Sequence, residues 1–81
     1  MADGSPTVPM THTERRVYSL LEREGPLSTR EIARRLGLST SMVRVALRRL
    51  IAEGVVSHRP DLEDARITVY FVRRKKRRDG H

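Results

Sequence analysis

The sequence predicts a small α+β domain that is mainly helical, with three helices followed by one two-stranded β-hairpin. Two observations lead to this prediction. Thr11 and Ser28 each stand three residues before a Glu, which is the spacing of a helix capping box. After Gly54 the apolar residues change from helical spacing to alternation, which is typical of strands. The 81 residues are enough for one domain, with little room for an enclosed catalytic pocket.

The first helix is predicted to begin after Thr11, whose hydroxyl is placed to form a capping box with Glu14. Gly25 and Pro26 should end this helix. We expect Gly25 to adopt the left-handed conformation, while Pro26 cannot continue the helical hydrogen bonding. The apolar face of this helix consists of Val17, Leu20 and Leu21.

The second helix is predicted over residues 29–36, because Ser28 and Glu31 repeat the capping-box spacing. Gly37 follows at the position where a left-handed residue commonly ends a helix. The inner face should consist of Ile32, Ala33 and Leu36.

The third helix is predicted over residues 39–53, with Ser39 as its N-cap. Gly54 should end it in a Schellman arrangement in which Val55 contacts Leu50. The residues expected to point into the core are Val43, Ala46, Leu47 and Leu50.

Two strands are predicted after the helices, over residues 55–59 and 66–72, joined by residues 60–65. Ile67, Val69 and Phe71 alternate with Thr68, Tyr70 and Val72, so the two sets should lie on opposite faces. A hairpin this short needs the helices to cover its apolar face.

Residues 29–43 resemble a helix-turn-helix motif. Ala33 stands where the two helices of such a motif touch, Gly37 in the turn, and Val43 as the aliphatic anchor of the second helix. Residues 47–56 are similar to the recognition helix and first wing strand of compact bacterial and archaeal transcriptional regulators. The resemblance covers residues 11–72 and implies a winged helix-turn-helix fold, with the third helix in the major groove of DNA.

The outward face of the third helix carries the predicted contacts to bases. Arg44 and Arg48 lie one turn apart and are suited to bidentate hydrogen bonds with guanine. Thr40 and Ser41 are suited to phosphate at the helix N-terminus, and Val45 to a thymine methyl group. The alternative is that both arginines are only good helix formers on a solvated face.

Four further arginines are candidates for contacts to phosphate. Arg30 and Arg34 belong to the second helix, which crosses the DNA backbone in motifs of this kind. Arg59 and Arg66 flank the wing loop, where they could reach phosphates or pair with the loop acids. Because like charges repel, we do not expect the loop tip to enter a minor groove. The loop acids are Asp61, Glu63 and Asp64.

The net charge of +7 is concentrated near the C-terminus. Residues 73–78 hold six of the 17 basic side chains, so residues 1–72 have 11 basic and nine acidic side chains. We expect residues 73–81 to form a disordered tail that binds phosphates without sequence preference, with a localisation signal as the weaker alternative. Residues 1–10 are expected to be a flexible leader. The cationic residues of the tail are Arg73, Arg74, Lys75, Lys76, Arg77 and Arg78.

These features predict sequence-specific binding of double-stranded DNA and regulation of transcription. Two alternatives remain: a nonspecific architectural DNA-binding protein, and a winged helix that binds RNA or protein in a larger assembly. A homodimer on a palindromic site and a partner in the transcription machinery are left open. We expect no catalysis, cofactor or metal, since the three histidines are scattered. The lack of cysteine and of a long apolar run predicts a cytoplasmic, nucleoid-associated protein without membrane contact.

Overall fold

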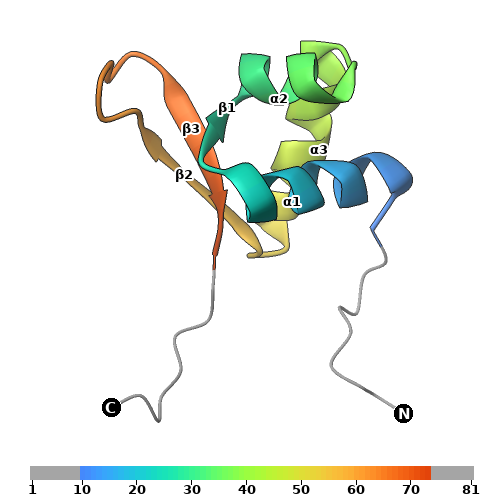
Figure 1. Ribbon diagram of the computed structural model, residues 1–81. Coiled ribbons are helices and arrows are strands. Elements are labelled where there is room, and N and C mark those ends of the chain that lie inside the picture. The colour runs from blue at the N-terminus through green and yellow to red at the C-terminus, as the bar shows by residue number, and fades with distance from the viewer. Residues whose placement is uncertain (1–9, 74–81) are drawn as a thin grey trace, which may run out of the picture.

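The computed structural model describes residues 10–73, which form three helices and a three-stranded antiparallel sheet. Figure 1 shows the helices packed together on one side and the β2–β3 hairpin, the wing, standing at the other. This confirms the predicted mainly helical α+β class. The elements in chain order are α1 (His12–Glu24), β1 (Leu27–Ser28), α2 (Thr29–Leu36), α3 (Thr40–Ala52), β2 (Val56–Pro60) and β3 (Thr68–Val72).

All three predicted helix starts are confirmed. The Thr11 Oγ1 atom accepts a hydrogen bond from the Glu14 backbone N–H, and the Glu14 carboxylate accepts one from the Thr11 N–H, each at 3.1 Å. Ser28 and Glu31 form the same pair of bonds at 3.2 and 2.9 Å. At the start of α3, the Ser39 hydroxyl accepts from the backbone N–H three residues later. Each cap satisfies a backbone donor and stabilises its helix by about 1 kcal/mol.

The end of α1 differs from the prediction. Gly25 has φ −64° and ψ 165°, so it is extended and not left-handed. Its backbone N–H donates to the Leu21 carbonyl at 2.8 Å. A Cβ atom at position 25 would lie 2.6 Å from that same carbonyl oxygen. Glycine is therefore needed here because the backbone of the preceding turn passes too close for any side chain.

The end of α3 is the predicted Schellman arrangement. Gly54 has φ +80°, a conformation that L-residues with a side chain rarely adopt. Its N–H donates to the Ile51 carbonyl at 2.9 Å, and the Val55 N–H donates to the Leu50 carbonyl at 3.2 Å. These two bonds satisfy carbonyl groups that the helix itself leaves free. The chain thereby leaves α3 directly into β2.

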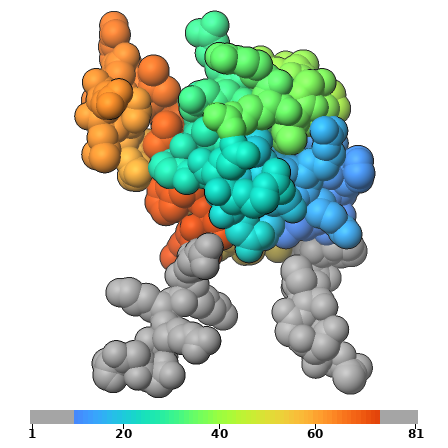
Figure 2. Space-filling view, viewed as in Figure 1, coloured from blue at the N-terminus to red at the C-terminus, as the bar shows by residue number. Residues whose placement is uncertain are grey.

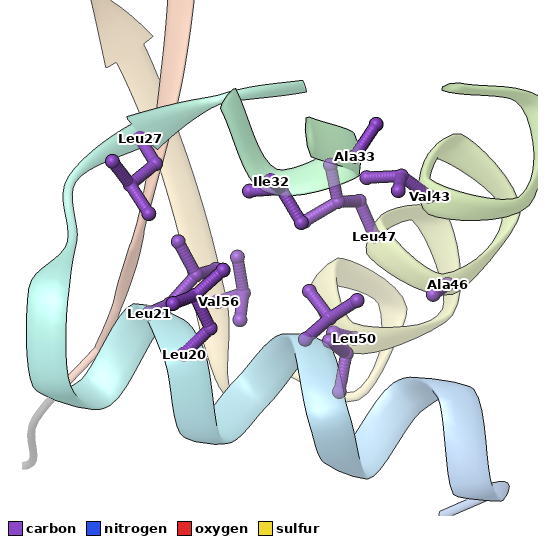
Figure 3. Close-up of a cluster of buried hydrophobic side chains, with 11 residues drawn as sticks. Leu20, Leu21, Leu27, Ile32, Ala33, Val43, Ala46, Leu47, Leu50 and Val56 are labelled. Atoms are coloured by element: carbon purple, nitrogen blue, oxygen red, sulfur yellow. The ribbon is translucent and has the colours of Figure 1, made fainter. Parts of the chain in front are cut away.

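The core lies between the three helices and the sheet. Figure 3 shows that side chains from α1, α2, α3 and β2 point toward one another, including Ile32, Leu47 and Val56. The aliphatic residues predicted for the inner faces of the helices are all buried except Leu36, which is half-buried. Because α3 turns one face into this cluster, its opposite face is left for contacts outside the domain.

The sheet contains one strand that the sequence did not predict. β1 is only two residues long and pairs with β3, so that the strand order is β1-β3-β2. The wing strands are also displaced slightly, since β2 ends at Pro60 and β3 begins at Thr68. Residues paired across the strands share a face. The core-facing set is Leu27, Val56, Tyr70 and Val72, all of which pack in or against the hydrophobic cluster.

Candidate nucleic-acid interface

The side of α3 that faces away from the core is accessible and carries mostly polar residues. Ser41, Arg44, Val45 and Arg48 are exposed, and Thr40 at the first helical position is half-buried. The buried residues of α3 fix the rotation of the helix about its own axis. Its exposed side chains therefore point away from the core in a defined direction. The five residues predicted from the sequence for the third helix are therefore together on one accessible surface.

Arg44 and Arg48 lie on the side of α3 that faces β3. With Ile51 and Tyr70 they line a shallow groove of about 230 Å³ between the helix and the sheet. Within residues 10–73 neither guanidinium group forms an ion pair. Both groups thus keep all of their hydrogen-bond donors for an external acceptor such as a base or a phosphate.

An apolar pair lies beside these arginines on α3. Met42 and Val45 are 47% and 53% exposed, and they are the two exposed large apolar residues of α3. They are three residues apart and line a groove of about 380 Å³ between α3 and the start of α1. Sequence analysis included Val45 but missed Met42, although the helical spacing from Val45 could have indicated it.

A wider groove separates the wing from the start of α2. It has a volume of about 680 Å³ and is lined by the side chains of Arg30, Arg34 and Arg59. Figure 2 shows the wing at the upper left standing apart from the helices, with this hollow between them. The groove therefore brings together two of the predicted phosphate-contacting arginines of α2 and one of the wing. Acidic residues also line it, namely Glu31, Asp61 and Glu63.

Arg59 is held in this groove by the sheet. Its guanidinium carbon lies 5.7 Å from the centre of the Phe71 ring, a cation–π contact between the neighbouring strands β2 and β3. Its Nη1 atom donates to the Pro60 carbonyl at 3.3 Å. These contacts leave other N–H groups of Arg59 available and reduce the freedom of the side chain before any ligand binds.

Arg66 is paired with a wing-loop acid, as the alternative in the sequence analysis allowed. Its Nε and Nη2 atoms donate to the two carboxylate oxygens of Asp64 at 3.1 and 3.2 Å, and its backbone N–H donates to the same group. The side-chain and backbone hydrogen bonds from Arg66 lower the pKa of Asp64. The Arg66 side chain remains 89% exposed, so the pair is a solvated one on the wing surface.

A second ion pair connects α1 to α3. Arg49 Nε lies 3.5 Å from Glu14 Oε2, and the Glu14 side chain is only 8% exposed. The sequence analysis assigned Glu14 only to the cap of the first helix. The same carboxylate therefore caps α1 with one oxygen and pairs with α3 with the other.

The predicted tail is described only at its first residue. Arg73 is exposed, and its backbone N–H donates to the Val55 carbonyl at 2.9 Å. The other basic residues proposed for phosphate contact lie outside the described residues, as do residues 1–9 of the predicted leader. Those basic residues are Arg74, Lys75, Lys76, Arg77 and Arg78.

Two other kinds of feature are absent from residues 10–73. No three His, Cys, Asp or Glu side chains of this part of the chain are grouped as metal ligands would be. None of the helices described has the length and apolar character needed to cross a membrane.

The helix-turn-helix with its exposed second helix and adjacent wing defines a class of DNA-binding domain. A model of the family described as "Winged helix-turn-helix DNA-binding" matches residues 10–57, and the chain belongs to this family. The predicted winged helix fold is confirmed.

The chain is also similar to individual regulators. It is 36% identical over 63 residues to the transcriptional regulator AdcR of Streptococcus pneumoniae serotype 2 (strain D39 / NCTC 7466), a match that covers 78% of this chain and 42% of AdcR. The structure of the transcriptional regulator Tm0710 from Thermotoga maritima matches with a TM-score of 0.75 and 28% identity, over 80% of this chain and 46% of that one.

Another solved structure shows the same relationship. The adhesin competence repressor AdcR from Streptococcus pyogenes matches with a TM-score of 0.73 and 25% identity, covering 79% of this chain and 46% of the repressor. The chain thus spans less than half the length of these relatives.

Proposed function

We propose that this chain binds double-stranded DNA sequence-specifically and acts in the regulation of transcription, without enzymatic activity, at the nucleoid in the cytoplasm. The observation that carries the proposal is the outward face of α3, where Arg44 and Arg48 are exposed and have no ion-pair partner in the described part of the chain. The family to which the chain belongs and the regulators it resembles support the same function.

In this proposal α3 enters the major groove with its outward face against the bases. Arg44 and Arg48 donate pairs of hydrogen bonds to guanine O6 and N7, each contributing about 1–3 kcal/mol of discrimination against other bases. Thr40 and Ser41 lie at the N-terminus of α3, where hydroxyl and backbone N–H groups bind phosphate and fix the helix along the DNA backbone.

The groove between α2 and the wing is proposed to receive the phosphate backbone. Arg30 and Arg34 reach it from α2, and Arg59 reaches it from β2. Arg66 contributes from the wing surface, although its pairing with Asp64 reduces the charge available to phosphate. The polybasic segment from Arg73 to Arg78 adds contacts to phosphate that carry no sequence information.

We further propose that two copies bind a palindromic site, because a two-fold protein dimer matches the symmetry of two half-sites. A partner in the transcription machinery would then be recruited through surfaces that DNA leaves free. The dimer and the recruited partner are both proposals, because the relatives are about twice the length of this chain.

A nonspecific architectural role is the second candidate. It is favoured by one observation, that six of the 17 basic residues form a single run. Such a run binds any polyanion, with an affinity that falls as salt rises.

The test is selection of duplexes from a random library, followed by titration of the selected and a scrambled duplex at several salt concentrations. The variants are Arg44→Ala and Arg48→Ala, with Arg23→Ala as a control that removes the same charge from an exposed position on α1. Sequence-specific binding predicts that the first two variants lose affinity mainly for the selected duplex. If no sequence is enriched, or each variant weakens both duplexes equally, base recognition by α3 is wrong.

A further inference from the structure

The exposed surface of α3 carries two kinds of side chain, a pair of arginines and a pair of apolar residues. Arg44 and Arg48 line the groove toward β3, whereas Met42 and Val45 line the groove toward α1. Ser41 is exposed between the two sides. The arginines provide hydrogen-bond donors, but the apolar pair offers no donor and only the weak acceptor of the Met42 sulfur, so hydrogen bonding to bases or phosphates does not explain why it is exposed.

One feature of the major groove is apolar. Thymine presents a C5-methyl group there, beside its O4 acceptor, and this methyl distinguishes thymine from the other three bases. An aliphatic side chain next to arginines can therefore read thymine in the same groove in which the arginines read guanine. Methionine fits such a role because its unbranched thioether chain adapts its shape to the surface it covers.

We infer that Met42 and Val45 form a thymine-specific contact, so that the DNA site recognised by α3 contains thymine methyl groups next to the guanines read by Arg44 and Arg48. This inference rests on the proposed function and deepens it.

The position of Val45 on α3 supports contact with DNA. Val45 follows Ser41 by four residues and precedes Arg48 by three, so all three lie on one continuous surface. Arg44 and Arg48, on the exposed surface that includes Val45, form no ion pair within residues 10–73, whereas Arg49 in the groove with Met42 is paired with Glu14. A polyanion is therefore the partner whose charge complements this surface, and its thymine methyls supply the matching apolar groups.

Both side chains are free to be truncated without loss of the fold. Each is about half exposed, and neither belongs to the cluster of core residues. Substitutions to alanine also favour the helix. The variants Met42→Ala and Val45→Ala should therefore unfold at nearly the wild-type temperature, which a thermal melt of each variant checks.

The test uses the full chain and duplexes in which single thymines of the selected site are replaced by deoxyuridine, which removes the C5-methyl group and keeps O4 and base pairing. We expect the Kd of the wild-type chain to rise about fourfold at each contacted thymine, since a buried methyl-sized group contributes about 0.8 kcal/mol. Val45→Ala should weaken binding to the thymine duplex. In this variant, replacing thymine with deoxyuridine should no longer raise the Kd at one of the positions, so the uracil penalty disappears there. Met42→Ala should do the same at a neighbouring position.

Two controls separate this effect from a general loss of affinity. Arg44→Ala should weaken binding yet keep the thymine-to-uracil ratio. Leu62→Ala removes a side chain that is 88% exposed on the wing loop, and it should also leave that ratio unchanged.

The outcomes distinguish this inference from the proposed function. If the chain selects a sequence but binds thymine and uracil duplexes equally at every position, the inference is overturned while base recognition stands. If no sequence is selected, both are overturned. If Met42→Ala and Val45→Ala lower the dimer population in sedimentation and leave the uracil penalty intact, this surface binds a second copy and the inference is overturned.

Discussion

The Glu14 carboxylate caps α1 and also lies 3.5 Å from Arg49 of α3. The buried carboxylate accepts a hydrogen bond from the Thr11 backbone through Oε1, and it contacts the guanidinium through Oε2. Glu14 thus accepts a hydrogen bond from a backbone N–H group at the start of α1. It also connects α1 to α3, the helix that carries the proposed DNA contacts.

Replacing Glu14 with alanine should lower the free energy of unfolding by about 1–2 kcal/mol. The change removes half of a capping box and leaves a small cavity beside α3. Arg49→Ala should cost less than about 1 kcal/mol, because the arginine is 65% exposed and its pairing is screened by solvent. Urea unfolding of both variants measures the difference. Equal costs would mean that the ion pair matters more than the cap.

Leu47→Ala should destabilise the domain by about 2–5 kcal/mol, because this side chain is 2% exposed and its loss leaves a cavity in the core. Arg48→Ala, at the next position and exposed, should change stability by less than about 0.5 kcal/mol. When both variants are measured well below the melting temperature, Arg48→Ala should lose more affinity for DNA than Leu47→Ala. A large stability loss in Arg48→Ala would contradict the assignment of its face to solvent.

Gly54→Ala and Gly25→Ala should both destabilise the chain, for different reasons. Position 54 has φ +80° and open space for a Cβ atom, so alanine there costs about 1–2 kcal/mol of conformational energy. Position 25 has an ordinary φ, but its Cβ would meet the Leu21 carbonyl oxygen at 2.6 Å. Asn at position 54 should recover part of the loss, since asparagine tolerates the left-handed region. No recovery is expected for Asn at position 25, and thermal melts test both.

Arg66→Ala should return the pKa of Asp64 toward the ordinary aspartate value, because hydrogen bonds from Arg66 lower it in the folded chain. A lowered folded-state pKa means that this pair contributes stability above the unfolded-state pKa and loses it as the pH falls through the folded-state pKa. The wing loop should therefore respond to acid and not to changes near neutrality. NMR titration of the Asp64 carboxyl group measures this, and an unchanged pKa in the variant would contradict the pairing.

Deletion of residues 74–81 should reduce the slope of log K against log salt by about 0.9 for each phosphate contact that is lost. Preference for the selected duplex should be retained, since the deleted segment carries no base contacts in the proposal. The control is a chain of full length in which Arg74, Lys75, Lys76, Arg77 and Arg78 are replaced by glutamine. If both variants keep the wild-type slope, the segment takes no part in binding.

Local signals in the sequence were sufficient to predict where the three helices begin. Capping side chains such as Thr11 and Ser28 act on backbone groups three residues away, so their spacing is visible in the chain. The exposed face of α3 followed from the positions of its buried residues for the same reason. The predicted roles of these residues in binding remain predictions.

Features that depend on distant segments were not predictable. β1 is two residues long and has no strand pattern of its own, so only its pairing with Tyr70 and Val69 defines it. The conformation of Gly25 depends on the path of the chain into β1, and the pairing of Glu14 with Arg49 depends on how α1 packs on α3.

The pairing of β1 with β3 also sets the geometry of the proposed footprint on DNA. Leu27 lies opposite Tyr70, one residue before the Ser28 cap of α2, so main-chain hydrogen bonds join the wing to the helix-turn-helix at that point. The span between the wing and α3 is consequently a property of the backbone. Exchanging surface side chains on α3 would change which bases are preferred, while the distance along the double helix between the two contacts would stay the same.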